Sequence, residues 1–239
     1  MIDADSSIWK HAQTLEPIHW MENKDAILDA NYRRQIQERS LSLQKLLAKY
    51  GPVSGDKLNI LEIGGGGTPL IDFFKGGERH EADPLADFYQ EQFGRVLDKS
   101  VVWHKTKGEK LPFEEGKFDV IISRNVLDHV QDDRQCLLEM HRVLKPGGIG
   151  YVAVNNFSGP LLWFRSAFKD PEHPYTYSHS SLDAKIRETS FKILDVFRDP
   201  PEHMAHFSQL ESSQICRKAI RSFFLGLRCY HYSEWIVSR

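Results

Sequence analysis

The fold of this chain is decided by residues 58–69, which read LNILEIGGGGTP. The first six residues are mostly apolar and have the length of a short buried strand. Glycines occupy residues 64–67, and glycine permits both a tight turn and the close approach of another molecule to the backbone. Thr68 and Pro69 then suit the N-cap and the first position of a helix, where proline's missing N–H costs nothing. The stretch therefore predicts a strand, a glycine-rich loop and a helix in succession.

Strand and helix patterns alternate along the rest of the chain. Short strands are expected at residues 79–82, 101–104, 118–123 and 149–155, and helices at residues 84–93 and 132–144. The segment KPGG, residues 145–148, is expected to end the second of these helices. Parallel strands need crossovers of this kind, so the alternation predicts a parallel sheet. The remaining expected elements are helices at residues 25–50 and 181–189 and strands at residues 191–198 and 228–237.

Two acids frame the glycine-rich loop. Glu62 lies just before the loop, and Asp83 ends the next expected strand, about 20 residues downstream. A carboxylate at this position, at the end of the second strand, can accept hydrogen bonds from both hydroxyls of an adenosine ribose. Two plainer alternatives stay open: a tight connection without a ligand, and Asp83 as a turn residue that precedes Pro84.

Four segments, in order, carry a resemblance to a known family. They are residues 61–66 (LEIGGG), residues 82–84 (ADP), residues 109–129 with EKLPF, FDVI and VLDH, and residues 142–148 (RVLKPGG). Together they resemble the motifs of class I S-adenosylmethionine-dependent methyltransferases over residues 58–155. The resemblance implies an α/β, Rossmann-like three-layer sandwich, whose seven-stranded, mainly parallel sheet has an antiparallel last strand.

The same resemblance implies that S-adenosylmethionine lies across the carboxyl ends of the first strands. The residues expected to hold it, from the methionine end through the ribose to the adenine, are Glu62, Gly64, Gly65, Gly66, Asp83, Leu85, Gly108, Glu109 and Leu111. Asn125, at the end of the fourth strand, is expected to face both the methionine end and the methyl acceptor.

Two positions depart from the family pattern. Thr68 stands where the family usually has a third glycine, although threonine still suits a helix cap. Lys107 stands where an acid often recognises the adenine amino group. Glu109 is the neighbouring acid that can take this part, and the alternative for Lys107 is a solvated loop residue.

The expected chemistry needs alignment more than a catalytic constellation, because the methyl group of a sulfonium is already activated. A hydroxyl acceptor also needs a general base, and His129 is our candidate because imidazole titrates near neutral pH. Alternatively, His129 only packs or hydrogen-bonds to the backbone. A second polar and aromatic group, which either lines the acceptor pocket or forms ordinary loop structure, consists of His173, Tyr175, Tyr177 and His179.

The domain organisation follows from the same elements. Residues 1–56 are expected to form a helical cap or lid, and residues 57–239 the S-adenosylmethionine-binding domain, with substrate-specificity elements in residues 156–225. The cap carries aromatic residues that either cover the ligand or pack onto the sheet, namely Trp9, His19 and Trp20.

Composition and sequence pattern argue against several other classes. With 239 residues, 41% apolar content and a net charge of −2, the chain can fill one core and has no general attraction to nucleic acids. A small-molecule acceptor is expected from the aromatic and polar character of the last third of the chain, in line with the family resemblance, while the sequence does not indicate the oligomeric state. The first ten residues lack the pattern of a secretory signal and no later apolar run would span a bilayer, so a cytoplasmic protein without membrane contact is expected. The three cysteines are far apart and His203 and His206 lack further ligands, so no metal is expected.

Two rival functions share these features. A nicotinamide-dependent oxidoreductase uses the same glycine turn and ribose acid, but the segments LPF and KPGG do not belong to its fingerprint. A catalytically silent, methyltransferase-like binding or scaffold protein would keep every motif, because a fold does not guarantee chemistry.

Overall fold

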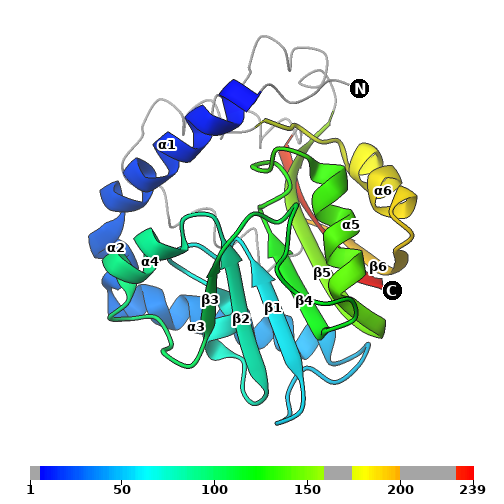
Figure 1. The fold of residues 1–239 in the computed structure, drawn as a ribbon, viewed down its shortest axis with the longest axis horizontal. Coiled ribbons are helices and arrows are strands. Elements are labelled where there is room, and N and C mark those ends of the chain that lie inside the picture. The colour runs from blue at the N-terminus through cyan, green and yellow to red at the C-terminus, as the bar shows by residue number, and fades with distance from the viewer. Residues whose placement is uncertain (1–5, 159–173, 200–229) are drawn as a thin grey trace.

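The protein is built around one seven-stranded sheet with the strand order β3-β2-β1-β4-β5-β7-β6 (Figure 1). The computed structural model describes residues 6–158, 174–199 and 230–239. The strands are β1 (Asn59–Ile63), β2 (Glu78–Asp83), β3 (Val102–Lys105), β4 (Phe118–Arg124), β5 (Leu144–Phe157), β6 (Lys192–Arg198) and β7 (Tyr230–Ser238). Strands β1 to β5 run parallel, and β7 is antiparallel to both of its neighbours. This confirms the expected mainly parallel sheet with an antiparallel last strand.

Helices cover both faces of the sheet (Figure 1). They are α1 (Ser6–Glu22), α2 (Lys24–Leu28), α3 (Ala30–Leu47), α4 (Ala86–Phe93), α5 (Asp133–Val143) and α6 (His179–Glu188), with one 3-10 turn, η1 (Leu70–Phe73). On one face, α5 and α6 bury residues such as Leu137 and Ile186 against the sheet. On the other face, α3 buries Ile36, Leu43 and Leu47. The result is the expected three-layer sandwich.

The connection from β1 to β2 differs from the expectation of a helix capped by Thr68. Only the 3-10 turn η1 forms, and Pro69 precedes it with an extended backbone (φ −66°, ψ 137°) rather than as the first helical residue. Thr68 is buried and does not cap the turn. The face that a longer crossover helix would cover is covered instead by α3, whose Arg33 forms an ion pair of 2.8 Å with Asp72 of η1. Helix α3 thus packs where the sequence predicted a helix between β1 and β2.

Two boundaries also differ from the sequence-based expectation. The expected helix at residues 25–50 is divided at Asp29, whose side chain accepts hydrogen bonds from the backbone N–H groups of Asn31 and Tyr32 and caps α3. Strand β5 begins at Leu144, not at Ile149, because Leu144 pairs with Phe118 before the ladder shifts in register. The KPGG segment therefore bulges within the strand rather than preceding it.

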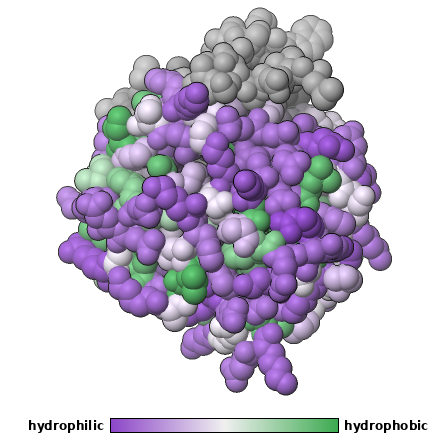
Figure 2. Space-filling view, in the orientation of Figure 1, coloured by the Kyte–Doolittle hydropathy of each residue, from purple (hydrophilic) through white to green (hydrophobic). Residues whose placement is uncertain are grey.

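Apolar side chains are mostly buried against the sheet. Figure 2 shows a face that is largely hydrophilic, with hydrophobic side chains only in small separate groups. Within the described ranges, no helix has both the length and the apolar character to cross a membrane.

Candidate functional site

The glycine-rich loop lies at the carboxyl end of β1 and has no room for side chains. Gly64 and Gly66 have φ angles of 67° and 60°, in the left-handed region that glycine adopts readily. A Cβ at Gly64 would lie 2.7 Å from Val126, and one at Gly66 would lie 2.6 Å from the ring of Trp20. Any larger residue at these two positions would therefore meet both backbone strain and a steric clash.

Two buried glutamates hold the glycine-rich loop and the turn η1 that follows it. Glu62 accepts a hydrogen bond of 2.7 Å from the N–H of Ile71, and Glu81 accepts one of 2.7 Å from the N–H of Gly65. The two residues are register partners on β1 and β2. Burial raises the pKa of Glu62 to about 7, and burial together with the neighbouring Glu62 raises the pKa of Glu81 well above its usual range.

Sequence reasoning did not identify Glu81. The signal was its place two residues before Asp83, which puts both acids on the same face of a central strand. A carboxyl group in a buried strand needs hydrogen-bond donors, and here the loop supplies one.

Asp83 lies at the carboxyl end of β2 and is 5% exposed. Its Oδ1 accepts a hydrogen bond of 2.7 Å from the N–H of Leu85. Burial, with a further contribution from the negative charge of Glu16, raises the pKa of Asp83 to about 7. The Asp83 carboxyl group therefore changes its protonation state near neutral pH.

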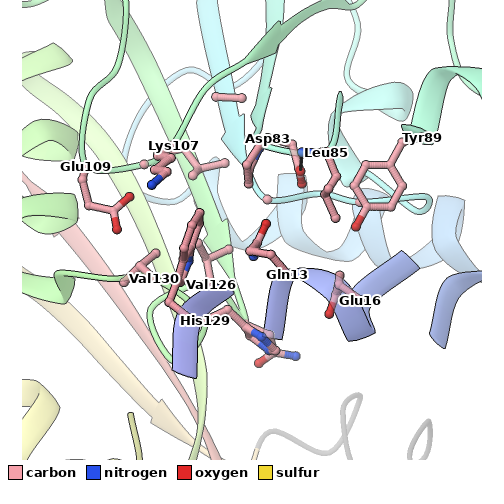
Figure 3. Close-up of a pocket in the computed structure, with 18 of the residues that line it drawn as sticks. Gln13, Glu16, Asp83, Leu85, Tyr89, Lys107, Glu109, Val126, His129 and Val130 are labelled. Atoms are coloured by element: carbon pink, nitrogen blue, oxygen red, sulfur yellow. Dashed lines mark hydrogen bonds between the residues drawn. The ribbon is translucent and has the colours of Figure 1, made fainter. Parts of the chain in front are cut away.

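A pocket opens where β1, β2 and β4 end (Figure 3). It contains about 650 Å³ of space, part of which is open to solvent. The residues that line it are Trp9, Gln13, Glu16, Trp20, Ile63, Gly64, Gly66, Ala82, Asp83, Pro84, Leu85, Tyr89, Lys107, Gly108, Glu109, Asn125, Val126, His129 and Val130. The sheet therefore brings together strand ends that are far apart in sequence.

Most of the sequence-predicted site residues line this pocket. They are Gly64, Gly66, Asp83, Leu85, Gly108, Glu109, Asn125 and His129. Glu62 and Gly65 lie behind the loop surface and take part in the hydrogen bonds that hold it. Leu111 is 4% exposed within the core, and its N–H donates to Glu139.

Helix α1 supplies one wall of the pocket (Figure 3). Trp9, Gln13, Glu16 and Trp20 recur every three or four residues, so they share one face of the helix. The indole N–H of Trp20 donates to Glu16 at 2.8 Å, and its ring packs edge-on against Tyr89 with 5.4 Å between centroids. Trp9 and Trp20 thus face the pocket, whereas His19 is not among its lining residues.

Lys107 and Glu109 both lie at the pocket edge and both bind the segment before α5. The Lys107 ammonium donates to the Gln131 side chain at 2.7 Å and lies 3.8 Å from the centre of the Trp9 ring. Glu109 accepts hydrogen bonds from the backbone N–H groups of Gln131 and Asp132. Lys107 is thus a structural link between this loop and α1 rather than a solvated loop residue.

Asn125 and His129 follow β4. Asn125 has a φ angle of 54°, rare for a residue other than glycine, and its buried Oδ1 has no hydrogen-bond partner among the described residues. The N–H of His129 donates to the carbonyl of Val126 at 2.8 Å, so one turn of chain presents the imidazole at the pocket.

The described members of the second polar and aromatic group, Tyr175, Tyr177 and His179, lie outside the pocket. Tyr175 and Tyr177 donate to the backbone carbonyls of Gln131 and Leu127, and neither lines the pocket. His179 stacks on Trp235, with 5.0 Å between ring centroids. The other residues in question, His173, His203 and His206, lie outside the described residues, as does most of residues 156–225. Among the residues described, no group of three or more potential ligands is arranged to hold a metal ion.

Comparisons with known proteins agree with this geometry. Residues 61–152 match the family model described as a methyltransferase domain. The chain is 26% identical over 132 residues to the uncharacterized protein YafE of Escherichia coli, covering 52% of this chain and 64% of that protein. It is 32% identical over 106 residues to a ubiquinone biosynthesis O-methyltransferase of Cereibacter sphaeroides, covering 41% of each. The chain thus spans less than two thirds of the length of these curated relatives.

Solved structures share the fold. A putative sarcosine dimethylglycine methyltransferase from Galdieria sulphuraria superposes with a TM-score of 0.66 at 16% identity, covering 84% of this chain and 85% of that one. Geranyl diphosphate C-methyltransferase from Streptomyces coelicolor gives a TM-score of 0.65 at 15% identity, covering 88% and 85%. Together with the strand order, these likenesses show a Rossmann-like fold shared with methyltransferases, and residues 61–152 match a methyltransferase domain.

Proposed function

We propose that the protein transfers a methyl group from S-adenosylmethionine to a small-molecule acceptor. The observation that carries the proposal is that Gly64 and Gly66, in the loop after β1, and the carboxyl group of Asp83 line the same pocket. Backbone free of side chains suits the close approach of a nucleotide-like molecule, and a carboxylate suits ribose hydroxyls. The methyltransferase domain match over this segment favours S-adenosylmethionine over a nicotinamide cofactor.

Each part of the pocket has a proposed role. Gly64 and Gly66 admit the methionine end, and Asn125 offers that end its unpartnered Oδ1. Asp83 accepts hydrogen bonds from the ribose. The residues proposed to surround the adenine are Leu85, Gly108, Glu109 and Leu111, with Leu111 acting from the core beneath.

Glu62, Gly65 and Glu81 serve this site indirectly. The hydrogen bond from Gly65 to Glu81 fixes the loop, and the one from Ile71 to Glu62 fixes the turn η1 that follows it. A loop held in one conformation loses less entropy when a ligand binds.

When bound, S-adenosylmethionine supplies an activated methyl group, and the chain's own residues align the acceptor and exclude water. Helix α1 contributes to that exclusion, because Trp9, Glu16 and Trp20 cover one side of the pocket. His129 is the proposed general base for a hydroxyl acceptor, since it lines the pocket one turn after Asn125.

The proposal is tested by titrating the purified protein with S-adenosylmethionine and with NAD⁺ in a calorimeter. We expect S-adenosylmethionine to bind and NAD⁺ to give no specific heat, because LPF and KPGG are typical of the methyltransferases. Methyl transfer is then followed with labelled S-adenosylmethionine and a panel of small metabolites. Binding without transfer to any of them would favour the silent scaffold, and preference for NAD⁺ would overturn the proposal.

A further inference from the structure

Two arginines and two tyrosines gather beside the pocket, on the face of the sheet that α3 covers. Arg124 is the last residue of β4, and Arg39 lies on α3. Tyr151 of β5 and Tyr232 of β7 belong to the buried core of this face. The charges of Arg124, Tyr32, Tyr232 and Tyr151 all act on the guanidinium of Arg39, which shares this face of the sheet. We call Arg39, Arg124, Tyr151 and Tyr232 the arginine–tyrosine cluster.

The two guanidinium groups of this cluster lack counter-charges in contact with them. Among the described residues, neither Arg39 nor Arg124 has an ion pair or a hydrogen bond from its side chain. Burial and the charge of Arg124 lower the pKa of Arg39 to about 10. Holding two like charges in a half-buried place costs free energy, and proteins normally pair such charges. Arg33, also on α3, shows the normal arrangement through its ion pair with Asp72.

Two acids near these residues each accept a hydrogen bond from another group. Glu62 accepts from the N–H of Ile71, and the hydroxyl of Tyr151 donates to Glu234 at 2.9 Å. Although the charge of Arg124 acts on Glu62, burial dominates and raises the pKa of that carboxyl group to about 7.

Polar atoms around the cluster are also unsatisfied. The Nε of Arg124, the Oδ1 of Asn125 and the Oδ1 of Asn155 are shielded from solvent and have no partner among the described residues. Asn155 lies opposite Tyr232 in the β5–β7 ladder, so all three atoms lie near the carboxyl ends of β4 and β5. Buried polar atoms are normally hydrogen-bonded, and a concentration of exceptions at strand ends is typical of a place where a polar ligand binds.

The cluster is joined to the donor pocket through consecutive residues, although none of its four side chains lines that pocket. Asn125 lines the pocket, and Arg124 directly precedes it on β4. We propose that Arg39 and Arg124 bind an anionic group of the methyl acceptor, a carboxylate or a phosphate, and so hold the acceptor beside the methionine end of the donor site. A guanidinium group suits either anion, because its fork of N–H donors matches two oxygens at once. This inference rests on the proposed function, and it specifies the acceptor as an acidic small molecule.

The test uses small aromatic probes of different charge, of which benzoate and benzamide match in size. The protein, saturated with S-adenosylhomocysteine, is titrated with benzoate, phenyl phosphate and neutral benzamide at constant ionic strength, and binding is followed by ligand-observed NMR. We expect at least one anion to bind about tenfold or more tightly than benzamide. Preference for benzoate assigns a carboxylate, and preference for phenyl phosphate assigns a phosphate.

Variants then locate the anion. Arg39→Gln and Arg124→Gln should each weaken binding of the preferred anion about tenfold or more while leaving S-adenosylhomocysteine affinity within about threefold. Arg34→Gln is the matched control, because Arg34 is an exposed arginine of the same helix. Circular dichroism checks that each variant is folded, and Arg39→Lys and Arg124→Lys replace any variant that is not.

The outcomes separate the two proposals. Equal binding of anions and benzamide by wild-type protein, or unchanged anion binding in both arginine variants, overturns the acceptor subsite. Either result leaves the proposed function intact if S-adenosylhomocysteine still binds. Failure of S-adenosylhomocysteine to bind in the first titration overturns the proposed function itself.

Discussion

Asp83 shows how one buried residue couples the pocket to pH. Its pKa of about 7 in the free protein means that the carboxyl group gains a proton as the pH falls through neutrality. Ribose hydroxyls donate best to the ionised form, so a bound ligand stabilises the carboxylate and lowers its pKa. Ligand binding must therefore release a proton below pH 7, and affinity falls as the pH falls through that range.

This coupling gives a prediction for Asp83→Asn. At about pH 8 the variant should bind S-adenosylhomocysteine more weakly by about 1.5–3 kcal/mol, the usual cost of losing hydrogen bonds to a charged group. Between about pH 6 and 8 its affinity should change little, whereas the wild-type affinity should rise with pH. Calorimetry at both pH values measures both effects. Asp87→Asn is the control, since Asp87 is an exposed acid paired with Lys105. A wild-type affinity that does not depend on pH would contradict the proposal that Asp83 binds the ribose.

At the scale of elements, α1 and α3 pack around the glycine loop in ways that the sequence of the loop does not predict. Helix α3 covers the sheet where a crossover helix was expected, and α1 places Trp20 against Gly66 and Gly67. Neither arrangement was predictable from local pattern, because each depends on contacts between distant parts of the chain. The cap at Asp29 was readable in principle, since an acid just before a helix is a common N-cap.

The position of α1 leads to a prediction for Trp20→Ala. Removing the indole opens the pocket wall beside Gly66, so S-adenosylhomocysteine should bind about five- to thirtyfold more weakly and dissociate faster. Stopped-flow fluorescence measures the dissociation rate, and calorimetry measures the affinity. Ile18→Ala is the control, because Ile18 lies on the same helix but is 55% exposed. Tighter binding in Trp20→Ala would mean that α1 obstructs the site instead of enclosing the ligand.

At the scale of the whole molecule, the sequence predicted the fold more completely than the site. Alternating strand and helix patterns from residue 58 to 155 were sufficient for the parallel sheet, although the 3-10 turn η1 replaces the helix expected after the first strand. Site residues at strand ends, such as Asp83 and Asn125, were predictable because parallel strands end at one edge. The hydrogen bond from Gly65 to Glu81 and the grouping of Arg39 with Arg124 were not, because these contacts join elements whose packing no local motif encodes.

The central claim is that a cofactor binds against the backbone of the glycine loop, and calorimetry with S-adenosylhomocysteine tests it most directly on wild-type protein, Gly64→Ala and Gly147→Ala. Both glycines have left-handed φ angles, 67° and 77°, so both substitutions carry similar backbone strain. A Cβ at Gly64 meets Val126 at the pocket, whereas one at Gly147 has no neighbour within 4 Å. We predict that the wild type and Gly147→Ala bind alike and that Gly64→Ala loses about tenfold or more in affinity. Equal affinity in all three proteins, or no binding by the wild type, would contradict the claim.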